Sequence, residues 1–304
     1  MGRHQRLSQE GKPVPSGGKP TARSRRLGST LRQLRLSAGL DQEQAAQAVD
    51  CSTAKISRIE SGTVKARLGD LRILLDLYEV ADQDRRDRLE RLARDSSKKG
   101  WWLDYDTSSL THLGDVVSME ADATSIQTWQ HAFLPGLLQT PAYTRALLAA
   151  NPTPLSPEAA DEVVQVRQAR QAVLRENGTE FAAVIWEPAI TTPMSSPHDR
   201  QDQLTHLLRT ADQQTITVQV LPFSQWGAAM AAPPFIAYSF GRDHSPEVVA
   251  TDTVSNTIMV EDSDEIANYD QAFSTLRSAA LSPQETKRFI TQQMDQLLQG
   301  DTSR

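Results

Sequence analysis

The sequence predicts a mainly α N-terminal domain followed by an α+β C-terminal domain, and three observations carry this prediction. Short segments with apolar residues at helical spacing fill residues 29–81. Segments that alternate polar and apolar residues appear later in the chain, between longer helical patterns. The charge also divides: residues 1–100 hold 21 lysines and arginines against 13 acidic residues, whereas residues 101–304 hold 11 against 25. A chain of 304 residues is long enough for two such domains.

Four segments are expected along the chain. Residues 1–28 are rich in Gly, Pro, Ser and Arg without periodicity, which predicts a disordered basic tail. Residues 29–81 predict a helical bundle, and residues 82–100 predict a charged linker helix with one narrow apolar edge. Residues 101–300 predict the α+β domain, anchored at its start by Trp101-Trp102.

Two short helices separated by a tight polar turn lie at the centre of the predicted bundle. Asp41 and Gln44 have the spacing of a capping box at the start of the first helix. We expect the tight turn at Asp50, because aspartate adopts a left-handed backbone more readily than most residues other than glycine. Ser52 caps the second helix, which ends before Gly62.

The second part of the chain predicts a mixture of strands and helices. The expected strands are residues 125–130, 180–186, 216–220, 235–240, 247–251 and 257–261. The expected helices are residues 109–121, a helix starting at Pro141, residues 156–176, residues 199–211 and two C-terminal helices. The acidic run 261–265 is expected to cap the first of these two C-terminal helices.

The second short helix of the bundle has a polar outer face. Ile56 and Ile59 are expected to point inward, and the outward side chains are Thr53, Ala54, Lys55, Ser57 and Arg58. Short polar side chains with two cations suit the major groove of DNA, and the positive balance of residues 1–100 suits phosphate neutralisation. The alternative is an ordinary helical hairpin with a solvated face. The arginine cluster 23–26 fits either a DNA-backbone contact or a solubilising tail.

The runs L-R-Q-L-R-L-S-A-G-L-D-Q and S-T-A-K-I-S-R-I-E-S-G resemble the Xre/Cro helix-turn-helix family over residues 29–80. The resemblance implies a sequence-specific transcriptional regulator that binds a double-stranded DNA operator as a homodimer. By this resemblance Gln42 contacts a phosphate, and Thr53, Ala54 and Arg58 lie at base edges. The residues placed near the DNA backbone are Ser52, Lys55, Lys65 and Arg67, with Ser57 on the same DNA-facing surface.

The same resemblance implies a structural ion pair. Arg35 and Glu60 match the buried pair that ties the first helix of the family to its recognition helix. Asp50 departs from the family pattern, which usually has glycine in the turn.

A second resemblance covers residues 101–290. The run P-G-L-L-Q-T-P-A-Y at residues 135–143 is its most specific part, and it is similar to the C-terminal domain of Scr-type, antitoxin-like actinobacterial regulators. That family implies a small protein partner that binds the regulator and alters its affinity for DNA. Residues 191–193 and 225–234 depart from the family pattern.

The sequence predicts no catalytic residue, metal site or cofactor. The six histidines show no metal-ligand spacing, and no phosphate loop or nucleophile elbow is present. Cys51 is the single cysteine, which excludes an internal disulfide and fits a reducing cytoplasm. No apolar run approaches the roughly 20 residues of a membrane span. We therefore expect a cytoplasmic protein that is nucleoid-associated when bound to DNA.

Three hypotheses remain for the C-terminal domain. It dimerises and binds a small protein, or it holds a small-molecule pocket walled by aromatic residues, or it is a hydrolase-like domain. The aromatic residues in question are Trp186, Phe223, Trp226 and Phe235, which fit a core equally well. Arg167 and Arg170 recur on one helix and predict either a salt-bridged face or an anion site.

Overall fold

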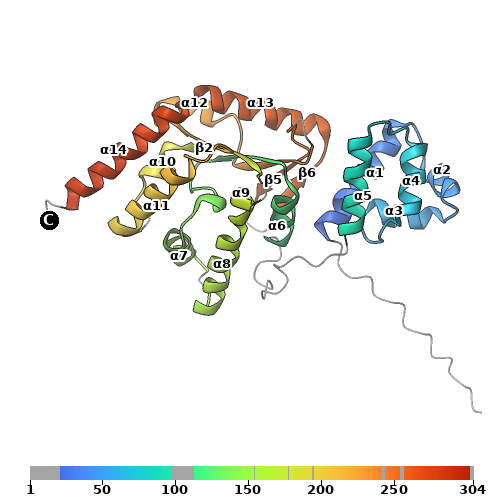
Figure 1. Cartoon of the computed structure of the whole chain (residues 1–304), viewed down its shortest axis with the longest axis horizontal. Helices are drawn as coiled ribbons and strands as arrows, with labels where there is room; N and C mark the ends of the chain where they lie inside the picture. The colour runs from blue at the N-terminus through green and yellow to red at the C-terminus, as the bar shows by residue number, and fades with distance from the viewer. Residues whose placement is uncertain are drawn as a thin grey trace, which may run out of the picture. The chain divides into compact units, whose positions relative to one another are not determined.

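The computed structural model describes residues 21–96 and 113–301, apart from residues 154, 177, 194, 242–243 and 254–256. The chain divides between Ser97 and Lys98 into two compact units. The first unit is helical and the second combines helices with one sheet, so the expected fold class is confirmed (Figure 1). The tail expected at residues 1–20 and the anchor at Trp101-Trp102 lie outside the described residues.

Five helices make up the described part of the N-terminal unit. They are α1 (Ala22–Ser37), α2 (Gln42–Ala48), α3 (Thr53–Glu60), α4 (Leu68–Leu77) and α5 (Gln83–Asp95). Each turns an apolar stripe inward, and the most deeply buried side chains of their shared core include Leu31, Ile56, Leu71 and Leu75.

Helix α1 begins earlier than expected, so the prediction of disorder up to residue 28 was wrong for residues 22–28. Thr21 caps the helix by accepting a hydrogen bond from the Ser24 backbone N–H at 3.1 Å. Leu27, two residues before the expected start of the bundle, is 2% exposed. A Cβ atom at Gly28 would lie 2.4 Å from the Ile59 carbonyl oxygen, so only glycine lets α1 approach α3 this closely. The arginine cluster 23–26 accordingly belongs to a helix, with Arg26 buried.

Helix α5 is also part of this bundle, which corrects the prediction of a linker between two domains. The narrow apolar edge expected from the sequence, Leu89, Leu92 and Ala93, is buried in the shared core. The Thr21 hydroxyl donates to the Ser96 carbonyl oxygen at 3.0 Å, which joins the start of α1 to the end of α5. The sequence indicated the apolar edge, and the packing shows which core it belongs to.

The C-terminal unit is built on one mixed sheet. In the described residues its strands are β1 (Ser125–Gln130), β2 (Glu180–Trp186), β3 (Ile216–Leu221), β4 (Phe235–Ser239), β5 (Val248–Asp252) and β6 (Thr257–Val260). Their order is β3-β2-β1-β4-β5-β6, with β1, β2 and β3 parallel and the remaining pairs antiparallel. All six strands were predicted from the sequence to within two residues at either end.

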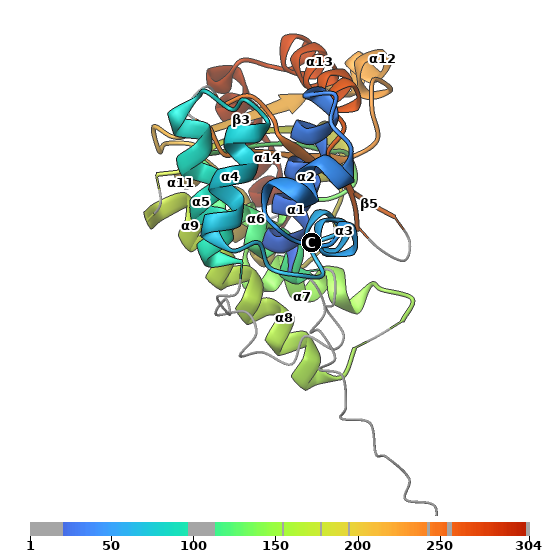
Figure 2. The same ribbon diagram turned by 90° about the vertical axis from the view of Figure 1, so that its right-hand side faces the viewer.

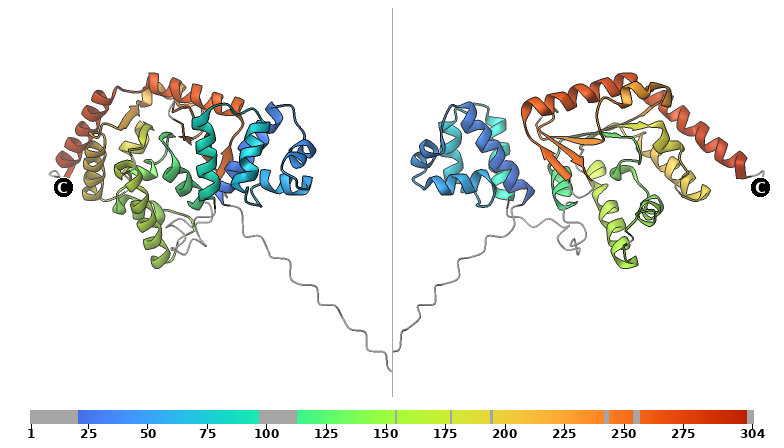
Figure 3. Two further views of the ribbon diagram at one scale, coloured as in Figure 1. Left: turned by 45° about the vertical axis from the view of Figure 1, so that its right-hand side comes forward. Right: turned by 180° about the vertical axis from the view of Figure 1, so that it is seen from behind.

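Helices cover both faces of this sheet. The larger ones are α6 (Leu113–Asp122), α7 (Pro141–Ala149), α8 (Pro157–Arg170), α9 (Ala172–Glu176), α11 (Pro197–Thr210), α13 (Ser263–Ala279) and α14 (Pro283–Asp301). Helix α13 runs along one face, and α6 and α8 lie on the other (Figures 1–3). The single helix expected at residues 156–176 is interrupted at Gln171, which separates α8 from α9.

The connections place strands β2 and β3 on one side of β1 and strands β4 to β6 on the other. After β1 the chain passes through η3 (Gly136–Leu138), α7, α8 and α9 to β2, and then through α10 (Glu187–Thr191) and α11 to β3. It returns through η4 (Phe223–Gln225) and α12 (Trp226–Ala229) to β4, on the opposite side of β1. The carboxyl end of β1 therefore lies at the point where the strand order reverses.

Candidate nucleic-acid interface

The α2–turn–α3 segment is fixed by local contacts that its sequence encodes. The Asp41 carboxylate accepts from the Gln44 backbone N–H at 2.8 Å, and the Gln44 side chain accepts from the Asp41 N–H at 2.9 Å. Asp50 has φ 47°, as the turn requires. The Ser52 side chain accepts from the Lys55 N–H at 3.3 Å and caps α3. Buried Ala45 lets α2 pack closely on α3.

A buried ion pair joins α1 to the end of α3. Arg35 donates through Nε to Glu60 Oε1 at 2.6 Å and through Nη2 to Oε2 at 3.1 Å. The two side chains are 7% and 5% exposed. Glu60, through its hydrogen bond and its charge, raises the pKa of Arg35 above its usual value against the opposing effect of burial. Gln42, expected at a phosphate, also donates to Glu60 Oε2, at 2.8 Å.

The outward face of α3 offers short side chains and one arginine. Thr53, Ala54, Ser57 and Arg58 are all exposed, whereas Ile56 and Ile59 are buried. Arg58 folds along its own helix, donating through Nε to the Ala54 carbonyl oxygen at 3.2 Å. No carboxylate among the described residues forms an ion pair with it, so its guanidinium is available to an external acceptor.

Lysine 55 differs from Arg58 in having an internal partner. Lys55 Nζ lies 2.8 Å from Asp70 Oδ2, where Asp70 belongs to the first turn of α4. This pair gave no signal in the sequence, because the two residues lie on different helices. Lys65 and Arg67 are exposed in the connection between α3 and α4, and Ser52 is exposed at the tip of α3.

A second buried ion pair lies in the C-terminal unit, between α6 and α8. Arg170 donates through Nε to Glu120 Oε2 at 2.8 Å and through Nη2 to Oε1 at 2.6 Å. Their side chains are 7% and 3% exposed. Of the two roles expected for the arginines of this helix, a salt-bridged face and an anion site, Arg170 has the first. Arg167 forms no ion pair among the described residues.

The four aromatic residues considered as a pocket wall differ in their burial. Phe235 is 1% exposed and belongs to the core between the sheet and α13. Trp186 stacks on Phe223, with ring centroids 5.8 Å apart. Phe223 and Trp226 are 60% and 64% exposed, and Met230 nearby in the sequence is 77% exposed. We call Phe223, Trp226 and Met230 the apolar patch.

Within the residues that the structure describes, no helix is both long and apolar enough to cross a membrane.

Comparisons with known proteins divide the chain at the same place as the structure does. A family model described as a helix-turn-helix domain matches residues 26–89, from α1 into α5. A second model, described as a domain of unknown function (DUF5753), matches residues 113–292, from α6 into α14. Neither the curated proteins nor the solved structures gave a match. The first match makes the chain a DNA-binding regulator. Because the second spans more than half of the 304 residues, the chain belongs to the DUF5753 family.

Proposed function

We propose that this chain is a sequence-specific transcriptional regulator of the Xre, antitoxin-like type, and that α3 reads its operator. The observation that carries the proposal is the exposed face of α3, where Arg58 lies among small side chains and has no ion-pair partner in the described part of the chain. An arginine fork matches the N7 and O6 acceptors of guanine in the major groove. The proposed contact set is Gln42, Ser52, Thr53, Ala54, Lys55, Ser57, Arg58, Lys65 and Arg67.

Lys55 and Gln42 each have an internal partner that DNA binding must displace or share. Lys55 must leave Asp70 to reach a phosphate, and Gln42 already donates one amide N–H to Glu60. The side-chain amide of Gln42 has a second N–H, so it is able to bridge Glu60 and a phosphate. This bridge would couple DNA binding to the Arg35–Glu60 pair.

Replacing Arg58 with alanine should cost about 1–3 kcal/mol on the preferred operator and flatten the preference at one base position in each half-site. Lys65→Ala should weaken binding to all sequences alike and lower the salt-dependence slope by about 1 per protomer. Selection of binding sites from random DNA, followed by titrations at several salt concentrations, measures both effects. Identical motifs recovered by the wild type and by Arg58→Ala would show that Arg58 positions the helix and reads no base.

We further propose that the C-terminal unit forms a homodimer and binds a small protein partner that modulates DNA binding. The apolar patch supports this proposal, because three large apolar side chains that are more than half exposed gather in one short segment. Aromatic and methionine side chains are enriched at protein interfaces.

Deleting residues 101–304 should leave sequence preference intact and weaken operator binding, because a dimer holds two half-sites at once. Light scattering and DNA titration of the full chain and of residues 1–100 test this expectation. The double variant Trp226→Ser, Met230→Ser tests the apolar patch separately from the dimer. It should reduce binding of the protein partner if the patch is the docking surface. A full-length protein that stays monomeric at micromolar concentration, with and without DNA, would refute the dimer.

A small-molecule-responsive repressor is the alternative function for the C-terminal unit. A cavity at the carboxyl end of β1 favours it, and of the four aromatic residues that the sequence indicated, Phe235 is the one that lines this cavity.

A further inference from the structure

A cavity of about 260 Å³ opens where the strand order of the sheet reverses. Its lining includes Gln130 at the end of β1, Phe235 at the start of β4 and Asp252 at the end of β5. Open α/β sheets bind ligands in the crevice outside the carboxyl ends of their strands at such a switch point. The position in the fold therefore favours a binding site.

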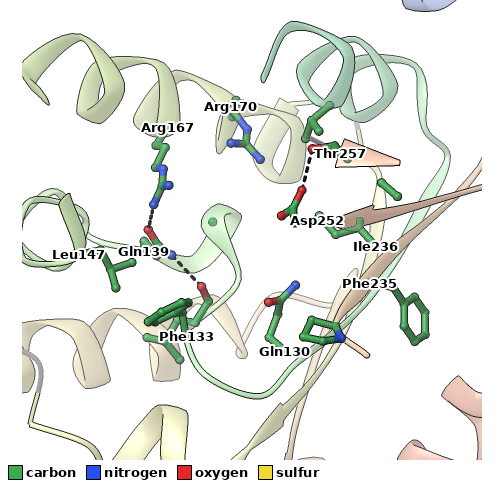
Figure 4. A pocket seen from close by; sticks show the side chains of 15 residues that line it. Gln130, Phe133, Gln139, Leu147, Arg167, Arg170, Phe235, Ile236, Asp252 and Thr257 are labelled. Atoms are coloured by element: carbon green, nitrogen blue, oxygen red, sulfur yellow. Dashed lines mark hydrogen bonds between the residues drawn. The ribbon is translucent and has the colours of Figure 1, made fainter. Parts of the chain in front are cut away.

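The cavity is lined by apolar and polar side chains together (Figure 4). The apolar ones include Val116, Phe133, Leu134, Leu147 and Ile236. The polar ones include Gln139, in the segment after β1, and, on the wall formed by α8, Arg167 and Arg170. Ligand sites in proteins typically combine an apolar lining with a few polar groups in this manner.

The two arginines on this wall differ in how their charge is compensated. Arg170 is neutralised by Glu120, its bidentate partner. Arg167 makes one hydrogen bond among the described residues, from Nη1 to the neutral amide oxygen of Gln139. A guanidinium has five N–H donors, so most of the donors of Arg167 have no acceptor in the described part of the chain.

Gln139 holds Arg167 in place. Its amide nitrogen donates to the Leu134 carbonyl oxygen at 2.7 Å, which turns its oxygen toward Arg167 (Figure 4). That oxygen also accepts from the Thr144 hydroxyl at 3.1 Å. The Gln139 backbone oxygen accepts from Gln171 Nε2 at 2.6 Å. The arginine is therefore oriented by a neutral and fully bonded group, which fixes its geometry without cancelling its charge.

The surroundings of Arg167 also disfavour its charge. Burial, and secondarily the neighbouring charge of Arg170, lowers the pKa of Arg167 to about 10. The side chain still carries its proton at neutral pH. An anion placed beside it would relieve this cost, because a buried cation is stabilised by an opposite charge and by hydrogen bonds to it.

We propose that this cavity binds a small organic anion, whose carboxylate or phosphate group pairs with Arg167 and whose apolar body lies against the wall formed by Phe133, Leu134 and Leu147. The site does not require that α3 reads DNA or that the chain dimerises, so it stands beyond the regulator function proposed above. Asp252, which accepts from the Thr257 hydroxyl at 2.7 Å, lies at the same cavity and disfavours a second negative group on that side.

Binding of three matched probes to the full chain tests the site. Benzoate and phenyl phosphate carry the two candidate groups on one apolar body, and benzamide is the neutral counterpart of benzoate. Calorimetric titration should show at least one of the two anions binding tenfold or more tightly than benzamide, and the stronger of the two identifies the group. In Arg167→Gln this preference for the anion should disappear, whereas it should persist in Arg145→Gln, which removes an exposed arginine outside the cavity.

The variant should remain folded, because it removes a partly buried charge that has no carboxylate partner among the described residues. Its midpoint of thermal unfolding in the absence of probe should equal or exceed that of the wild type. Arg167→Met is a second variant with a side chain of similar length. It is used because the amide introduced by Arg167→Gln could itself donate a hydrogen bond to the probe. Three results would overturn the proposal: no saturable binding of either anion, equal binding of benzamide and benzoate, or an anion preference that survives in both Arg167 variants.

Discussion

Replacing Glu60 with alanine should lower the free energy of unfolding of the N-terminal unit by about 3–5 kcal/mol, the usual cost of leaving one member of a buried ion pair alone. Glu60 accepts hydrogen bonds from Arg35 and from Gln42, and its side chain is 5% exposed. Without it, the Arg35 guanidinium stays buried, and its remaining hydrogen-bond acceptor among the described residues is the Leu40 carbonyl oxygen, at 2.8 Å. The loss should be greatest where α1 meets α3.

Chemical unfolding of a fragment spanning residues 21–97, followed by circular dichroism, measures this effect. The fragment must include Thr21, which caps α1 and bonds to Ser96. Arg35→Ala and the double variant complete a cycle, in which the two changes should be strongly non-additive. Glu43→Ala is the matched control, because it removes an exposed acid from α2 and should cost less than about 1 kcal/mol. Additive losses of that small size for Glu60 and Arg35 would contradict the role of the pair.

Replacing Glu120 with alanine should destabilise the C-terminal unit by a similar amount, about 3–5 kcal/mol. The change strands Arg170, whose side chain is 7% exposed and has its Nε and Nη2 groups on Glu120. Arg167 would then face an unpaired Arg170 on the same helix, so two uncompensated cations would share one wall of the cavity. Their repulsion adds to the cost of burial.

Tryptophan fluorescence isolates this effect in the intact chain, because all five tryptophans lie beyond residue 100. Asp161→Ala provides the control: its partner Arg145 and Asp161 itself are 57% and 59% exposed, and an exposed pair contributes about 0–1 kcal/mol. Equal shifts of the unfolding midpoint in the two variants would show that burial does not distinguish the two pairs.

Much of the fold was predictable because its signals are local. The strands at residues 125–130 and 180–186 were predicted at their observed bounds, since alternation along a strand needs no knowledge of its neighbours. The capping box at Asp41 and the left-handed turn at Asp50 depend on residues within one turn of helix, and both are present. The start of α1 was missed because most of its residues are polar or charged. The apolar edge of α5 was predicted, but an edge alone does not show which core it packs against, and only the packing makes both segments part of the bundle.

By itself, the sequence determined the fold class, the strands, the helix caps and the residues on the outer face of α3, because periodicity and capping act over a few neighbouring positions. The tertiary structure alone decided which charges are compensated. Arg167 and Arg170 look equivalent on α8, yet Arg170 meets a carboxylate 50 residues away and Arg167 meets a neutral amide 28 residues away. Lys55 and Arg58 differ in the same way, because only Lys55 lies opposite Asp70. A charge is neutralised or left for a ligand by the side chain that folding brings within about 3–4 Å of it, and sequence spacing does not encode that distance.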